Sequence, residues 1–112
     1  MFNKMKDMGN LVKKAKEMKD EMKRVQNELK DQKVLGENKQ KTVKVLLTGE
    51  LNCVGLQISP EALLEATKDE KKKKALEKAI TEAFNQSAEK AKTLASGKLS
   101  KISQGLNIPG LT

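Results

Sequence analysis

The side chains that most often carry out catalysis or bind metal ions are scarce in this sequence. It contains no histidine, tyrosine or tryptophan, so the commonest general base and the usual metal ligand are both absent. Its single cysteine, Cys53, has no histidine to activate it as a nucleophile and no second cysteine with which to hold a metal ion. We therefore predict that the protein is not an enzyme and has no cofactor, no metal site and no small-molecule substrate.

Lysine is the functional side chain that the sequence supplies in excess. Lysine and arginine together number 23, against 15 aspartates and glutamates, which gives the 112-residue chain a net charge of +8. Two dense groups are Lys13, Lys14 and Lys16 early in the chain, and Lys71, Lys72, Lys73 and Lys74 later. An excess of positive charge favours an anionic partner such as a nucleic acid.

The other residue types restrict the kind of nucleic acid. Phe2 and Phe84 are the only aromatic residues, so unpaired bases have no platform on which to stack. Arg24 is the only arginine, which leaves little capacity to read guanine, whereas lysines suit phosphates as point charges. We therefore predict contacts to the phosphate backbone of double-stranded DNA, with weak sequence preference.

The first lysine group falls on a predicted amphipathic helix from Asn10 to Gln32, with Asn10 as its N-cap. Starting at Met8, the apolar residues alternate between spacings of three and four residues, which defines a heptad seam. The predicted seam contains Leu11, Ala15, Met18, Met22, Val25 and Leu29. We expect these residues to pack in the core or against a second chain, while the lysines beside them stay free.

Three short strands are predicted in the middle of the chain. The first covers residues 33–37. In the second, which starts at Thr42, Val43, Val45 and Leu47 share one face by strict alternation, as in a half-buried strand. Residues 53–58 alternate in the same way and follow after a short turn, so the two segments form an antiparallel hairpin.

The chain beyond the hairpin is predicted to be helical. Ser59 and Pro60 are a helix start, a capping hydroxyl followed by proline. A second long helix is predicted from Asp69 to Ala95, with Phe84 on its buried apolar stripe.

This order of elements predicts an α+β fold, in which a long N-terminal and a long C-terminal helix flank a small three-stranded antiparallel sheet. We assign residues 1–104 to a single domain and residues 105–112 to a mobile tail. So small a sheet exposes its edges, and we expect a homodimer that protects them. With neither a secretory signal nor a membrane-spanning segment in the sequence, we expect a cytoplasmic protein with no membrane partner.

Six segments stand in a characteristic order along nearly the whole chain. They are MGNLVKKAKEMKDEMKRVQNEL, VLGE, VKVLLTGELNC, ISPEALL, LEKAITEAFNQSAEKA and GLNIPGL. Together they resemble the YbaB/EbfC family of bacterial nucleoid-associated proteins. The resemblance implies an intertwined homodimer with long projecting helices that binds double-stranded DNA in the nucleoid, and a role in nucleoid organisation and gene regulation. It also implies that Lys23 and Arg24 join the lysines of the first helix. The loop after the first strand departs from the family pattern, and we predict its Lys39 and Lys41 as further DNA contacts.

Two alternatives remain from the residues themselves. Two long helices flanking a hairpin are also typical of a prefoldin-like chaperone or a coiled-coil adaptor, in which the methionines would form an adaptable apolar clamp for client segments. The lysines and methionines near the amino end are also compatible with a helix lying on a membrane surface, although its apolar seam is narrow and acidic residues interrupt it.

Overall fold

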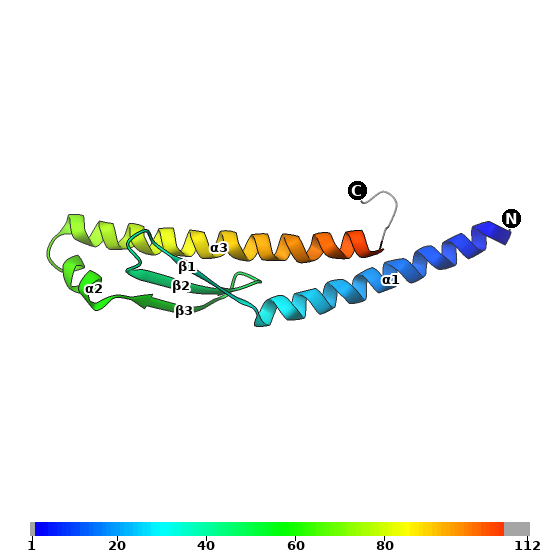
Figure 1. The fold of residues 1–112 in the computed structure, drawn as a ribbon, viewed down its shortest axis with the longest axis horizontal. Coiled ribbons are helices and arrows are strands. Elements are labelled where there is room, and N and C mark those ends of the chain that lie inside the picture. The colour runs from blue at the N-terminus through cyan, green and yellow to red at the C-terminus, as the bar shows by residue number, and fades with distance from the viewer. Residues whose placement is uncertain (1, 107–112) are drawn as a thin grey trace.

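The computed structural model of the protein describes the backbone of residues 2–106 and the side chains of residues 8–102. It is an elongated molecule, 79 × 22 × 17 Å, with a three-stranded sheet between two long helices (Figure 1). The elements are α1 (Phe2–Asp31), β1 (Lys33–Glu37), β2 (Val43–Thr48), β3 (Cys53–Ile58), α2 (Pro60–Ala66) and α3 (Glu70–Leu106). The predicted α+β fold is confirmed.

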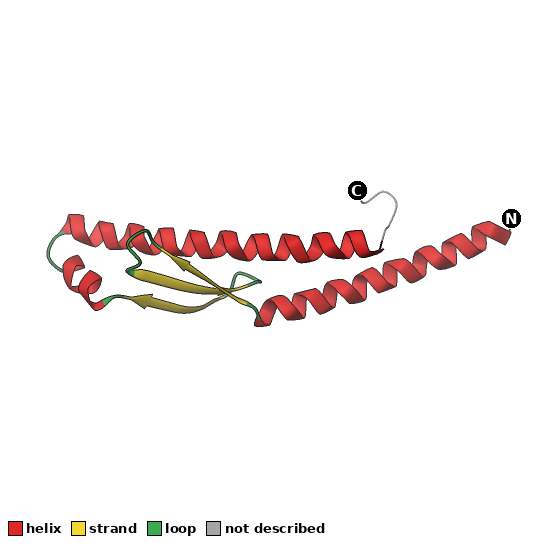
Figure 2. Cartoon of the chain, in the orientation of Figure 1, coloured by secondary structure: helices red, strands yellow, loops and turns green. Residues whose placement is uncertain are grey.

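The sheet is antiparallel, in the order β1-β2-β3, and α3 covers one of its faces (Figure 2). Val43, Val45 and Leu47 of β2 are buried against Ala83 of α3 and form the main core. The alternation of apolar residues in β2 predicted this buried face correctly, because successive side chains of a strand point to opposite faces.

The backbone of β1 lies unusually close to α3. A Cβ atom on Gly36 would lie 2.2 Å from the carbonyl oxygen of Ala83 and 2.4 Å from the backbone nitrogen of Ser87. Ser87 is itself buried, and its hydroxyl donates a 2.9 Å hydrogen bond to the carbonyl of Val34. Only small residues on both elements permit this approach, which explains the glycine in β1 and the alanine and serine in α3.

Side chains of α3 also bond the outer edge of β1. The side-chain oxygen of Gln86 accepts a 2.7 Å hydrogen bond from the backbone N–H of Glu37, and the ammonium of Lys90 donates a 2.8 Å bond to the carbonyl of Leu35. Both backbone groups face away from β2, so side chains of α3 occupy part of this edge of the sheet.

The turn after β2 anchors the C-terminal end of α1. The backbone N–H of Gly49 donates to the carbonyls of Leu29 (2.8 Å) and Gln32 (3.0 Å), two of the groups that the end of a helix leaves unpaired. Beyond this anchor, α1 runs alongside the second half of α3 in the opposite direction (Figure 1). Val25 and Leu29 of α1 pack there against Ile102 of α3.

The short helix begins as its sequence predicted. The side-chain oxygen of Ser59, the N-cap of α2, accepts a 3.1 Å hydrogen bond from the backbone N–H of Ala62, and Pro60 occupies the first turn. None of the helices within residues 2–106 combines the length and the apolar character that a membrane crossing requires.

Both long helices exceed their predicted bounds. Asn10 is not an N-cap, because α1 already begins at Phe2, and α3 continues past Ala95 to Leu106. The extension of α3 places Ile102 against α1, and this packing outweighs the poor helix propensity of Gly97. Two residues of the predicted mobile tail, 105 and 106, are therefore helical, and residues 107–112 lie outside the described part of the chain.

The predicted core is only partly buried within one chain. Phe84 is 43% exposed, so it is not buried within the single chain as predicted: it lies about 100° around the helix from Ala83, which faces the sheet. On the side of α3 that faces the sheet, the close approach to β1 leaves no room for an aromatic side chain. Along α1, Leu11, Ala15 and Met22 are exposed, whereas Met18, Val25 and Leu29 belong to the cluster that packs on Ile102 of α3.

Candidate nucleic-acid interface

The two flanks of α1 carry opposite charges. Since a helix turns about 100° per residue, positions separated alternately by three and four residues share a side. One side carries Glu17, Glu21 and Glu28. The other side carries four fully exposed lysines, which we call the lysine row: Lys16, Lys19, Lys23 and Lys30.

The acidic side of α1 is turned toward α3. The three glutamates line a groove of about 700 Å³ between the two helices, and Lys98 and Lys101 of α3 line its opposite wall. Val25 and Ile102 form its apolar part. Because α3 occupies this flank of α1, the lysine row lies on the flank that faces away from α3.

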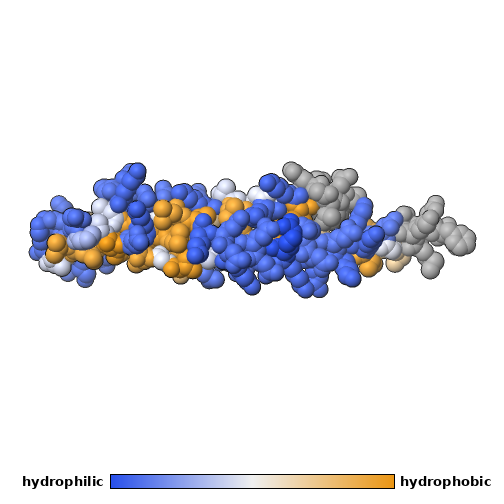
Figure 3. Space-filling view, turned by 60° about the horizontal axis from the view of Figure 1, so that its bottom comes forward, coloured by the Kyte–Doolittle hydropathy of each residue, from blue (hydrophilic) through white to orange (hydrophobic). Residues whose placement is uncertain are grey.

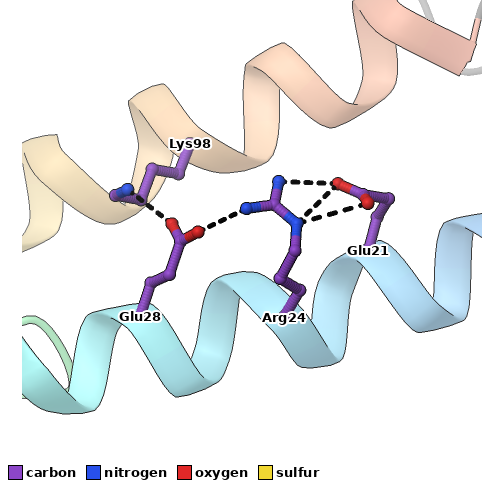
Figure 4. A network of polar contacts seen from close by, with 4 residues as sticks. All are labelled: Glu21, Arg24, Glu28 and Lys98. Atoms are coloured by element: carbon purple, nitrogen blue, oxygen red, sulfur yellow. Dashed lines mark hydrogen bonds and ion pairs between the residues drawn. The ribbon is translucent and has the colours of Figure 1, made fainter.

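An ion-pair network joins the two helices across this groove (Figure 4). Glu28 accepts a 2.8 Å hydrogen bond from the ammonium of Lys98 and also pairs with the guanidinium of Arg24. Arg24 reaches Glu21 at 2.7 Å through its terminal nitrogen. Arg24, which we predicted as a DNA contact, is thus engaged with two carboxylates of its own helix.

The network shifts the ionisation of its members. The hydrogen bond from Lys98 is the main cause that lowers the pKa of Glu28, and the hydrogen bond from Arg24 lowers the pKa of Glu21. In return, Glu21 raises the pKa of the Arg24 guanidinium. These shifts favour the charged form of both glutamates and so preserve the ion pairs as the pH falls toward the ordinary range of a carboxyl group.

The other predicted lysines of α1 divide between the sides of the helix. Lys16 and Lys23 belong to the lysine row. Lys14 shares its side with Glu17 and Glu21, in steps of three and four residues, and Lys13 lies on the surface opposite the apolar seam. All four are exposed, but only two of them stand together.

The later lysine run lies at the other end of the molecule. Residues 71–74 open α3, far from the N-terminal half of α1 (Figure 1). Their charge is partly matched locally: Lys72 pairs with Glu65 at 3.0 Å, and its backbone N–H bonds the carboxylate of Asp69 at 2.8 Å. The structure therefore does not bring the two predicted lysine groups into one surface.

Lys39 and Lys41 are exposed in the turn between β1 and β2. The side chain of buried Asn38 fixes this turn, because its oxygen accepts 2.9 Å hydrogen bonds from the backbone N–H groups of Thr42 and Val43. Lys39 lies beside Glu82 of α3. The turn thus belongs to the half of the molecule where α3 begins, not to the α1 arm.

Lys19 and Lys30 were not among the predicted contacts. Their signal was present in the sequence, because Lys16, Lys19 and Lys23 follow the same alternation of three and four residues as the apolar seam, and Lys30 is one heptad further. Which side of α1 is free, however, depends on Lys98, which lies 70 residues from its partner Glu28.

A lysine-bearing helical arm attached to a small α+β body is typical of a protein that binds a polyanion. The chain belongs to the YbaB/EbfC DNA-binding family, whose model matches residues 5–106. This confirms the family that the sequence segments indicated.

Two similar proteins accompany this family match. The chain is 31% identical over 105 residues to the nucleoid-associated protein TTE0040 of Caldanaerobacter subterraneus subsp. tengcongensis, covering 94% of this chain and 90% of that protein. Its fold is similar to that of the uncharacterized protein HP0035 from Helicobacter pylori, with a TM-score of 0.64 at 21% identity, over 80% of this chain and 86% of that one.

Proposed function

We propose that this protein is a nucleoid-associated protein that binds double-stranded DNA as a homodimer, mainly through lysine contacts to the phosphate backbone, with weak sequence preference. The observation that carries this proposal is the row of exposed lysines on α1, in a chain that belongs to a DNA-binding family. A relative at 31% identity is named as nucleoid-associated, which supports a cytoplasmic location in the nucleoid and a role in its organisation.

The homodimer is supported by apolar surface that the single chain leaves uncovered. Leu56 of β3 pairs with Val45 and so lies on the face that α3 covers, yet it is 50% exposed, because α3 packs on β1 and β2. Val54 is equally exposed, and Phe84 lies open on α3. Figure 3 shows apolar surface in the region of β3 and α2 beside the hydrophilic surface of α1. A second copy would bury such a surface.

The seam residues of α1 remain predicted dimer contacts. Met8 and Leu11 are 66% and 57% exposed in the single chain, and apolar side chains in a heptad arrangement are usually covered by another helix. Sedimentation equilibrium over a range of concentrations tests the dimer directly. A monomer at all concentrations would contradict it.

The DNA-binding proposal predicts a steep dependence of affinity on salt. If the dimer contacts about six phosphates, the logarithm of the association constant should fall with the logarithm of salt concentration with a slope of about −5. Fluorescence anisotropy with several unrelated duplexes measures the slope and the sequence preference together. A folded protein that binds none of these duplexes at low salt would overturn the proposal.

The exposed apolar seam also favours a second candidate, a prefoldin-like chaperone that holds client segments between its helices. In that case the protein should suppress aggregation of an unfolded client and show no affinity for duplex DNA. The same anisotropy measurement therefore separates the two functions.

A further inference from the structure

We propose that the lysine row on α1 is the surface that meets the DNA backbone, and that Lys19 and Lys30 are contact residues whereas Arg24 and Lys14 are not. This inference rests on the proposed function, because it names the part of the molecule that performs it. It replaces a scattered set of basic residues by one flank of one helix.

The length of the row suits a phosphate backbone. Lys16 and Lys30 are 14 residues apart, which corresponds to about 21 Å along a helix axis. Each DNA strand has one phosphate about every 3.4 Å along the duplex axis, so about 21 Å of that axis contains about six phosphates per strand, more than the four ammonium groups of the row. Four flexible ammonium groups can reach different phosphates within that length without competing for one of them.

The lysines of the row are not paired with carboxylates in the described part of the chain, and Asp20, which follows Lys19 in the sequence, lines the groove on the other flank. Each of the four positions of the row is exposed, and none of the ion pairs among residues 8–102 involves any of these lysines. Arg24, by contrast, would have to leave Glu21 and Glu28 before it could meet a phosphate.

The contact between α1 and α3 decides which flank of α1 is presented. Lys98 draws Glu28 toward α3, while Val25 and Leu29 pack on Ile102. Together these contacts fix the rotation of α1 about its own axis, with the acidic flank inward and the lysine row outward. Glu28 and Lys98 are therefore positioning residues for DNA binding and do not contact the DNA.

The row also has a gap that offers a test by gain of function. Lys16, Lys19, Lys23 and Lys30 follow steps of three, four and seven residues, and Gln26 occupies the position that would complete the alternation. Gln26 is exposed. A lysine at this position would join the row without disturbing the packing.

Two double variants of the full chain with the same change of charge on the same helix test the proposal. Lys19→Gln with Lys30→Gln should reduce the steepness of the salt slope by about 0.9 for each lost contact, or about 1.8 for one arm. Between 50 and 200 mM salt, the wild-type affinity should then fall about twelvefold more than that of the variant. Lys13→Gln with Lys14→Gln should leave the slope unchanged, and circular dichroism confirms that both variants are folded.

The gain-of-function variant is measured in the same assay. Gln26→Lys should make the slope steeper by about 0.9, whereas Thr93→Lys, which adds a lysine at an exposed position of α3, should not change it. If the wild type binds DNA but the two double variants change the salt slope equally, the lysine row is not the contact surface, and the proposed function still stands. No binding by the wild type would instead overturn the proposed function itself.

Discussion

The two halves of this molecule are held together in different ways. Where α3 crosses the sheet, the contact consists of buried side chains and backbone atoms in close approach, with Gly36 against Ala83 and Ser87. Where α3 meets α1, the contact consists of a few apolar side chains and surface ion pairs. The difference teaches that the sheet and the first half of α3 form a rigid body, and that α1 is an arm whose orientation depends on a small number of residues.

The same alanine substitution at two glycines should give the largest contrast between the halves. Gly36→Ala places a methyl group 2.2 Å from a backbone oxygen of α3, so we expect a loss of about 3 kcal/mol in the free energy of unfolding, at the upper end for overpacked sites. Gly97→Ala meets no atom within 4 Å and should stabilise α3 by up to about 1 kcal/mol. Urea unfolding measures both. Equal effects would contradict the close approach of α3 to β1.

A smaller effect is expected from truncating the apolar contact between α1 and α3. Leu29→Ala should lower the free energy of unfolding by about 2 kcal/mol, at the lower end for a buried leucine, because Leu29 belongs to a small apolar cluster. Hydrogen exchange should accelerate in α1 more than in β2. Leu11→Ala, at a site that is 57% exposed in the single chain, should cost less than about 0.5 kcal/mol when the protein is monomeric. A larger cost at Leu11 would show that a second copy buries this residue.

The smallest effect on stability should come from the ion pair between the two helices. Glu28→Gln keeps the shape of the side chain but removes the charge that Lys98 and Arg24 share. Because the pair is on the surface, we expect almost no change in melting temperature but faster hydrogen exchange in the first half of α1. Glu89→Gln, the same change at an exposed site of α3, is the control. Similar exchange in both variants would mean that the pair does not position the arm.

The pH dependence of the arm follows from the same residue. The pKa of Glu28 is lowered in the folded chain from its ordinary value of 4.5, so its contribution is fully present above that value and is lost as the pH falls below it. The protection factors of the α1 amides, which correct for the slower intrinsic exchange at low pH, should therefore fall on acidification through this range, and the Glu28→Gln variant should lack this component.

The strands could be predicted from the sequence. A strand with one buried and one exposed face alternates apolar and polar residues, and six residues are enough to show this alternation. The helix ends could not be predicted in this way. Gly97 and the serines around it have poor local helix propensity, and the helix persists there because Ile102 finds Val25 on a distant element. The burial of Phe84 within the chain was predicted for a related reason. How many residues of α3 face the sheet depends on how closely α3 approaches Gly36, which the sequence does not show.

The candidate site was predictable in kind but not in detail. The excess of lysine was enough to predict a DNA-binding protein, as the family confirms, and the amphipathic first helix is the element that we propose meets the DNA. The assignment of Arg24 could not be judged from its residue type, because its availability depends on the rotamers that bring it to Glu21 and Glu28. Lys19 and Lys30 belong to the proposed lysine row but were not among the predicted contacts. They are distinguished from Lys13 and Lys14 only once the position of α3 is known.

The bonds that Gln86 and Lys90 make with β1 also limit how copies of this chain can assemble. A sheet that offers both of its edges can add further chains without end and grow into a filament, whereas a sheet with one edge occupied cannot. Since Gln86 and Lys90 already occupy part of the β1 edge, we expect any association of these sheets through their strands to use β3. An assembly through β3 alone would be closed after two chains and would not polymerise through the sheet.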